Sequence, residues 1–152
     1  MYAKILVPLD GSLTSQRGFE EAVALARVMK SSLLLLHVID TMPVAGDIFD
    51  PGVWQDIADA LRRNGDELTA QARRTATGYG VPNEVRLIEN PVGRVADAIV
   101  DTARSENCDL VVMGTHGRRG FSRVMMGSDA ELVVRHCPLP VLLVRHPEAR
   151  RS

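Results

Sequence analysis

The fold of this chain follows most directly from residues 110–128, which read LVVMGTHGRRGFSRVMMGS. Four apolar residues typical of a buried strand lead into a glycine-rich loop, and a helix-like segment follows the final serine. Four of the fourteen residues from Gly114 to Gly127 are glycine, a residue that loses much conformational entropy on folding and therefore needs a structural reason. Backbone N–H groups gathered around an anion give such a reason, and a long surface loop without a ligand is the alternative. We expect a strand–loop–helix unit that binds phosphate, with Ser128 capping the helix.

Two common nucleotide-binding signatures do not fit this loop. A Walker A loop requires lysine directly after a glycine, and the only lysines are Lys4 and Lys30, neither of which follows one. A dinucleotide-binding fold requires three glycines after its first strand, where this chain has only Asp10-Gly11-Ser12. The remaining pattern is Gly-x2-Gly-x9-Gly-Ser, with Gly114, Gly117, Gly127 and Ser128 at its fixed positions.

This pattern resembles the ATP-binding branch of the universal stress protein family. Three other segments also look like that family, namely ILVPLDGS at residues 5–12, His37-Val38, and PLPVLLV at residues 138–144. The resemblance spans nearly the whole chain. It implies ATP, or AMP or ADP, as the ligand and a parallel sheet with strand order 3-2-1-4-5.

Apolar runs alternate with amphipathic stretches along the chain. We expect strands at residues 4–9, 33–39, 85–88, 110–113 and 140–144, with the third and fifth at the sheet edges. Helices are expected from the cap Ser12 to about residue 29, and at 54–79, 92–105 and 128–136, with a lid-like loop over 40–53. The alternation indicates an α/β fold: a five-stranded parallel sheet with helices on both faces, as in a Rossmann-like three-layer sandwich.

Composition narrows the class of protein. A length of 152 residues suits one nucleotide-binding domain over 1–152, and a formal net charge of −1 gives no reason to expect nucleic-acid or membrane partners. The residues before the first strand do not have the charged and apolar pattern of a secretory leader, so we expect a protein that is not secreted. No apolar run approaches the ~20 residues that span a bilayer. The two cysteines, Cys108 and Cys137, lack metal-ligand spacing and are interpreted as small buried hydrophobic residues in a reducing cytoplasm.

In an open α/β sheet the ligand lies beyond the carboxyl ends of the strands, where the strand order reverses. With the implied order, the crevice lies between strand one, ending at Pro8-Leu9-Asp10, and strand four, ending at Met113-Gly114. The predicted nucleotide-binding residues are Pro8, Leu9, Asp10, Val38, Met113, Gly114, His116, Gly117, Arg118, Gly127, Ser128 and Asp129. No catalytic residue and no protein metal site are predicted; Mg²⁺ would arrive with the nucleotide phosphates.

Each of these residue types suits a particular part of an adenine nucleotide. Gly117, Gly127 and Ser128 offer amides and a hydroxyl to phosphates, and Val38 offers an apolar wall to the base. Asp10 suits the ribose or a phosphate-bound Mg²⁺, with a simple turn aspartate as its alternative. Met113 lies either beneath the base or in the plain core. For His116, phosphate or sugar contact and a solvated loop position stand equally open.

Asp129 departs from the family pattern, which usually has a small or apolar residue there. A carboxylate in the first turn of a helix suits the helix dipole but repels a nearby triphosphate unless Mg²⁺ intervenes. The number of phosphates that the loop accepts is therefore open between ATP, ADP and AMP.

The leading functional hypothesis is an adenine-nucleotide-binding module for stress response or signalling. One alternative is a weak ATPase or autophosphorylating protein, with Ser122 or Ser128 as acceptor, although the sequence shows no nucleophile–base pair. Another is a dimerisation module without ligand. Homodimerisation through residues 140–144 is expected in either case, because an apolar strand at a sheet edge is usually covered.

Overall fold

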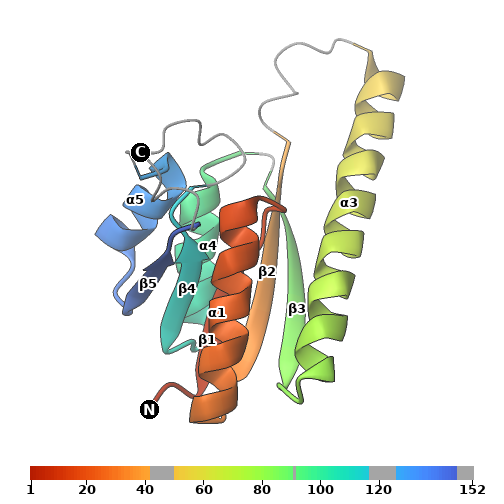
Figure 1. The fold of residues 1–152 in the computed structure, drawn as a ribbon. Helices are drawn as coiled ribbons and strands as arrows, with labels where there is room; N and C mark the ends of the chain where they lie inside the picture. Colours follow the sequence, from red (N-terminus) through yellow and green to blue (C-terminus); the bar gives the residue numbers. More distant parts are fainter. Residues whose placement is uncertain (42–49, 91, 117–125, 147–152) are drawn as a thin grey trace.

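The computed structural model of the 152-residue chain describes residues 1–41, 50–90, 92–116 and 126–146. Along these residues strands and helices alternate (Figure 1). The strands are β1 (Lys4–Pro8), β2 (Ser32–Asp40), β3 (Asn83–Asn90), β4 (Leu110–Gly114) and β5 (Val141–Val144). The helices are α1 (Leu13–Met29), α3 (Pro51–Gly78), α4 (Val95–Ser105) and α5 (Ser128–His136).

The five strands form one sheet in the order β3-β2-β1-β4-β5, and every neighbouring pair is parallel. In the central register, Leu6 of β1 pairs with Leu34 of β2 on one side and with Val111 of β4 on the other. The predicted α/β class and strand order are therefore confirmed. β3 and β5 form the two edges, as expected from the sequence.

Helices cover both faces of the sheet and bury two separate cores. Ile5 and Val7 of β1 pack into the core under α1 and α3, whereas Leu6 packs into the core under α4 and α5. Successive strand side chains point to opposite faces, so a strand covered on both sides must be apolar at every position. Figure 1 shows this arrangement of three layers, with the sheet between two layers of helices. Because both faces are covered, β1 and β2 are largely continuous apolar runs rather than alternating ones.

The start of α3 differs from the prediction. The sequence predicts Pro51 and Gly52 in a loop before a helix that begins at residue 54, but the helix begins at Pro51. Asp50 is its N-cap and accepts hydrogen bonds from the amides of Gly52 (2.8 Å) and Val53 (3.2 Å). Proline fits the first helical position because it lacks an N–H that would have no partner there. α4, in turn, begins at Val95, three residues later than expected.

Gly65 lies on the buried face of α3 and contacts the sheet. The sequence shows only a helix-weakening residue at this position. The structure shows instead a contact between α3 and β2 that has no room for a larger side chain. Among the residues that the structure describes, no helix is long and apolar enough to cross a membrane.

Candidate functional site

The carboxyl ends of β1 and β4 lie side by side. Because all the strands are parallel, their carboxyl ends form one edge of the sheet, which is different from the outer edges at β3 and β5. β1 pairs with both β2 and β4. The helix that follows β1, α1, packs on one face of the sheet, whereas the helix that follows β4, α5, packs on the other face. This is the point at which the strand order reverses, where open α/β sheets bind ligands. It brings the predicted residues Pro8, Leu9 and Asp10 next to Met113 and Gly114, which lie about a hundred residues later in the chain.

Hydrogen bonds fix the turn from β1 to α1. An oxygen of the Asp10 carboxylate accepts from the amide of Ser12 at 2.8 Å, and the Asp10 amide donates to the hydroxyl of Ser15 at 3.1 Å. The Ser15 hydroxyl also donates to the carbonyl of Pro8, while Ser12 caps α1 by accepting from the Ser15 amide. Gly11 has a φ of 80°, which favours glycine at the apex. The backbone of the turn that follows β1 is therefore held in a defined conformation.

Gly114 allows α1 to pack directly on the end of β4. A Cβ at this residue would lie 2.6 Å from the carbonyl carbon of Thr14, 2.7 Å from its oxygen and 2.9 Å from the amide nitrogen of Ser15. Facing it, a Cβ on Gly18 would lie 3.1 Å from the Gly114 nitrogen. The reason for glycine here is close packing against a helix backbone. The Thr14 hydroxyl also donates to the carbonyl of His116, which fastens the start of the glycine loop to α1.

The other end of the glycine loop leads into α5, and here the predicted cap is wrong. Gly127 is the N-cap, with extended φ and ψ of −63° and 152°, and Ser128 is the first helical residue. The Gly127 amide donates to the carbonyl of Thr115 at 2.8 Å, so the two ends of the loop are joined. The amides of the first helical turn, beginning at Ser128, have no acceptor within the helix. Asp129 lies in this same turn.

Val38 and Met113 lie on the α4 and α5 side of the sheet. Val38 is half-buried near the end of β2, and Met113 is 7% exposed within the same core as Ala130 of α5. Nδ1 of His116 lies 2.9 Å from the Thr115 hydroxyl oxygen. The remaining two predicted residues, Gly117 and Arg118, lie outside the described residues.

Two residues that precede β4, Cys108 and Glu106, have shifted pKa values. Burial raises the pKa of Cys108 to about 11, so this thiol stays protonated, as expected of a small core residue. Cys137 is half-buried against the same core. Hydrogen bonds from Arg86 and Lys4 lower the pKa of Glu106 at the end of α4. Within the described ranges, no group of three or more His, Cys, Asp or Glu side chains could hold a metal ion.

Three residues that support the site were missed from the sequence. Thr14 and Ser15 bond the turn and the loop as described above, and His37 is a buried histidine whose Nδ1 lies 2.7 Å from the carbonyl oxygen of Leu9. Ser15 and His37 share a signal that was available in the sequence. Each is a polar residue at a position whose periodicity predicts burial, and a buried polar group requires a hydrogen-bond partner.

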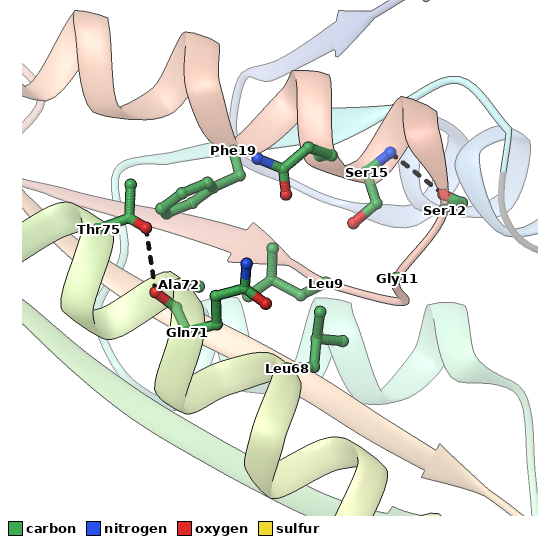
Figure 2. A pocket seen from close by; sticks show the side chains of 10 residues that line it. Leu9, Gly11, Ser12, Ser15, Phe19, Leu68, Gln71, Ala72 and Thr75 are labelled. Carbon is green, nitrogen blue, oxygen red and sulfur yellow. Dashed lines mark hydrogen bonds between the residues drawn. The ribbon is translucent and has the colours of Figure 1, made fainter.

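A small cleft lies behind the same turn, between α1 and α3. Figure 2 shows Leu9 facing Leu68 and Ala72 of α3 across this cleft, with Ser12 and Ser15 at its upper rim. Leu9 and Ala72 belong to the same core cluster, and Leu68 packs against it. The turn and the start of α1 thus have the end of β4 on one side and α3 on the other.

Known proteins are similar to this chain over almost its whole length. The model of the universal stress protein family matches residues 1–145. A universal stress protein of Methanocaldococcus jannaschii is 32% identical over 148 residues, which covers 97% of this chain and 85% of that protein.

Solved structures of universal stress proteins have the same fold. One from Lactobacillus plantarum superposes with a TM-score of 0.81 at 28% identity, covering 95% of this chain and 98% of that chain. Another is a universal stress protein in complex with cAMP, with a TM-score of 0.69 at 25% identity, covering 94% of this chain and 97% of that chain.

Proposed function

Because the chain belongs to the universal stress protein family, we propose that it binds an adenine nucleotide where β1 and β4 end. The observation that supports this most is the meeting of the β1–α1 turn, the end of β4 and the first turn of α5 at the point of strand reversal. A structural relative whose complex contains cAMP supports the adenine class of ligand. Nucleotide occupancy would then change the partners or the assembly of a stress-response or signalling module.

The described residues suggest a role for each part of the site. The first-turn amides of α5, beginning at Ser128, suit phosphate because they lack helical acceptors and carry the positive end of the helix dipole. Asp10 suits a ribose hydroxyl, since a carboxylate accepts hydrogen bonds from hydroxyl groups and the bond from the Ser12 amide fixes this one at the turn. The Gly127 amide is engaged with Thr115, so amides other than that of Gly127 would bind phosphate.

The base would be enclosed by apolar residues. The half-buried side chain of Val38, near the end of β2, would contact one side of the base, and the core residue Met113 would pack beneath it. Pro8, Leu9, Gly114 and His116 contribute backbone around the crevice, and Gly117 and Arg118 remain in the proposed phosphate loop. ATP, ADP and AMP are the candidate ligands, with Mg²⁺ when more than one phosphate is present.

Binding can be tested with purified protein and a matched pair of nucleotides. We expect AMP and ATP, with and without Mg²⁺, to raise the thermal midpoint, whereas GMP has little effect. A ligand at 100 times its Kd stabilises the folded state by about 2.7 kcal/mol, which a thermal-shift measurement resolves easily. No shift with any adenine nucleotide, together with no nucleotide released on denaturing freshly purified protein, would contradict the proposal.

The site itself is tested by Asp10→Asn, which keeps an oxygen to accept from the Ser12 amide but removes the charge. We expect AMP affinity to fall about ten-fold, the effect of losing roughly one charge-assisted hydrogen bond. Asp101→Asn, on the exposed face of α4, is the matched control and should bind normally. Equal affinity in the two variants would remove Asp10 from the site.

We also propose that the protein forms a homodimer through β5. This strand is at the edge of the sheet, and Leu142 is 38% exposed on it. Pairing with a second copy of the same strand covers such an edge with a symmetric interface.

A further inference from the structure

His37 is a polar side chain within the apolar run of β2 and is 8% exposed. Its neighbour Val38 packs toward the core under α4 and α5. Because strand side chains alternate, His37 points to the opposite face, where α3 covers β2 and β3. A histidine at such a position lies behind the proposed nucleotide site rather than in it.

The ring of His37 is bonded to the last residue before Asp10. Its Nδ1 lies 2.7 Å from the carbonyl oxygen of Leu9, and because a carbonyl only accepts, Nδ1 carries the proton and donates. The Leu9 amide in turn donates to the carbonyl of Leu36 at 2.7 Å. Both backbone polar groups of Leu9 are therefore held by two consecutive residues of β2.

On its other side the ring is packed against Gly65 of α3. A Cβ at Gly65 would lie 2.7 Å from Cδ2 of His37, 3.2 Å from its Nε2 and 3.0 Å from Cδ2 of Leu87. Glycine within a helix costs about 1 kcal/mol relative to alanine, so its presence here requires a packing reason. The close approach of α3 to the imidazole supplies that reason.

We propose that His37 is a positioning residue for the nucleotide site. Packed against Gly65, its imidazole fixes the Leu9 carbonyl and, through it, the Asp10 turn at the edge of the crevice. The inference rests on the proposed nucleotide-binding function for its functional consequence. It makes the affinity for nucleotide depend on the position of α3, a helix that supplies none of the predicted ligand contacts.

Two pairs of variants separate positioning from mere packing. His37→Asn places an amide N–H close to the position of Nδ1, whereas His37→Gln places it nearer to Nε2 and loses the bond to Leu9. Gly65→Ala presses on the ring from α3, and Gly78→Ala is its matched control, since a Cβ there meets nothing within 4 Å. Each protein is examined in two ways: the Kd for AMP by calorimetry, and the exchange rate of the Asp10 amide by NMR without nucleotide.

We expect His37→Gln and Gly65→Ala to weaken AMP binding about five-fold or more, the effect of losing one hydrogen bond of about 1 kcal/mol. In both, the Asp10 amide should exchange faster, because its bond to Ser15 depends on the turn. His37→Asn and Gly78→Ala should stay within about two-fold of the parent Kd.

Unchanged exchange of the Asp10 amide in folded Gly65→Ala and His37→Gln would overturn the inference. If His37→Gln does not fold, Gly65→Ala decides the matter alone. Should the parent protein bind no nucleotide, the proposed function fails, but the exchange measurement still shows whether His37 holds the turn. Equal AMP affinity in His37→Asn and His37→Gln, both weaker than the parent, would show packing alone and also overturn it.

Discussion

At the scale of single residues, Gly114 connects packing with the site. The atoms that a Cβ at this position would meet belong to the backbone of Thr14 and Ser15, so no side-chain rotation can relieve the contact. Gly114→Ala must move the start of α1 away from β4. We expect a loss of about 1–3 kcal/mol in the free energy of unfolding, the usual cost of overpacking, measured by urea denaturation.

Gly78→Ala provides the control for this measurement, because it lies at the end of α3 with open space around it. It should be neutral or more stable by up to about 1 kcal/mol, since alanine favours helices over glycine. Equal stability of the two variants would show that α1 adjusts freely, and would remove the close-packing explanation for Gly114.

Asp129 determines, on our proposal, how many phosphates the site tolerates. Its carboxylate lies in the first turn of α5, where the helix dipole favours negative charge and where phosphate would also bind. In Asp129→Asn we expect ATP affinity to rise relative to AMP affinity by about three-fold or more, an effect of ~0.7 kcal/mol or more. The comparison is made by calorimetry without Mg²⁺. An unchanged ATP-to-AMP ratio would show that Asp129 does not oppose the outer phosphates.

At the scale of elements, an ion-pair network joins the amino-terminal ends of the strands to α4. Glu106, which follows α4, contacts Nε of Arg86 in β3 at 2.9 Å and Nζ of Lys4 in β1 at 3.3 Å. Lys4 also lies 3.6 Å from a carboxylate oxygen of Glu84. These pairs connect three elements distant in sequence, whereas most other ion pairs among the described residues join positions three or four apart.

The network predicts a specific acid dependence of stability. Hydrogen bonds from Arg86 and Lys4 lower the pKa of Glu106 below its usual 4.5 in the folded protein. The stabilisation is therefore present above pH 4.5 and is lost as the pH falls through the lowered pKa of the folded state. In Glu106→Gln we expect a smaller loss of stability over that acid range than in the parent, measured as the urea midpoint at each pH.

Glu20→Gln is the control for this pH series. The pKa of Glu20 in the parent is also lowered, chiefly by the hydrogen bond from Arg17. The Glu20–Arg17 pair, however, lies on the exposed surface of a single helix, α1. Such pairs contribute little, so its curve should follow that of the parent. If the urea midpoints of both variants fall equally over the acid range, the Glu106 network contributes no more to stability than an ordinary surface ion pair.

The elements were largely predictable because their signals are local. Buried parallel strands are apolar at every position, and Ser12 marks the start of α1 as its side chain caps the helix. The start of α3 was misplaced because Pro51 and Gly52 also signal loops, and only the capping bonds to Asp50 distinguish the two cases. Similarly, serine at residue 128 favours a cap by residue type, whereas the backbone angles that make Gly127 the N-cap cannot be read from residue types.

The candidate site was predictable in its location but not in its supporting contacts. The glycine loop and Asp10 follow two strands that are neighbours in this fold, so the reversal of strand order brings them together. The reason for Gly114 depends instead on the distance of closest approach between α1 and β4. The role of His37 depends on which residue of α3 faces it, and neither distance leaves a pattern in the sequence.

At the scale of the whole molecule, the sheet separates two helical layers that meet the proposed site differently. In the proposed complex the first turn of α5 would face the phosphates from one layer, while α1 and, by our inference, α3 would support the β1–α1 turn from the other. The site thus lies where both layers contact the same sheet edge, and a ligand there would touch elements of each. On this arrangement, nucleotide binding is expected to stabilise the two layers together.

The sheet edge at β5 predicts the oligomeric state of the whole molecule. Leu142 lies on the same face of the sheet as the buried Val144 but is 38% exposed, so a second copy of β5 would cover it. We expect the parent to sediment as a dimer at micromolar concentration, and Leu142→Glu to sediment as a monomer because two carboxylates would face each other across the twofold axis. Val28→Glu, at an 83% exposed position of α1, should remain dimeric. A monomeric parent, or a dimeric Leu142→Glu, would place the assembly interface elsewhere.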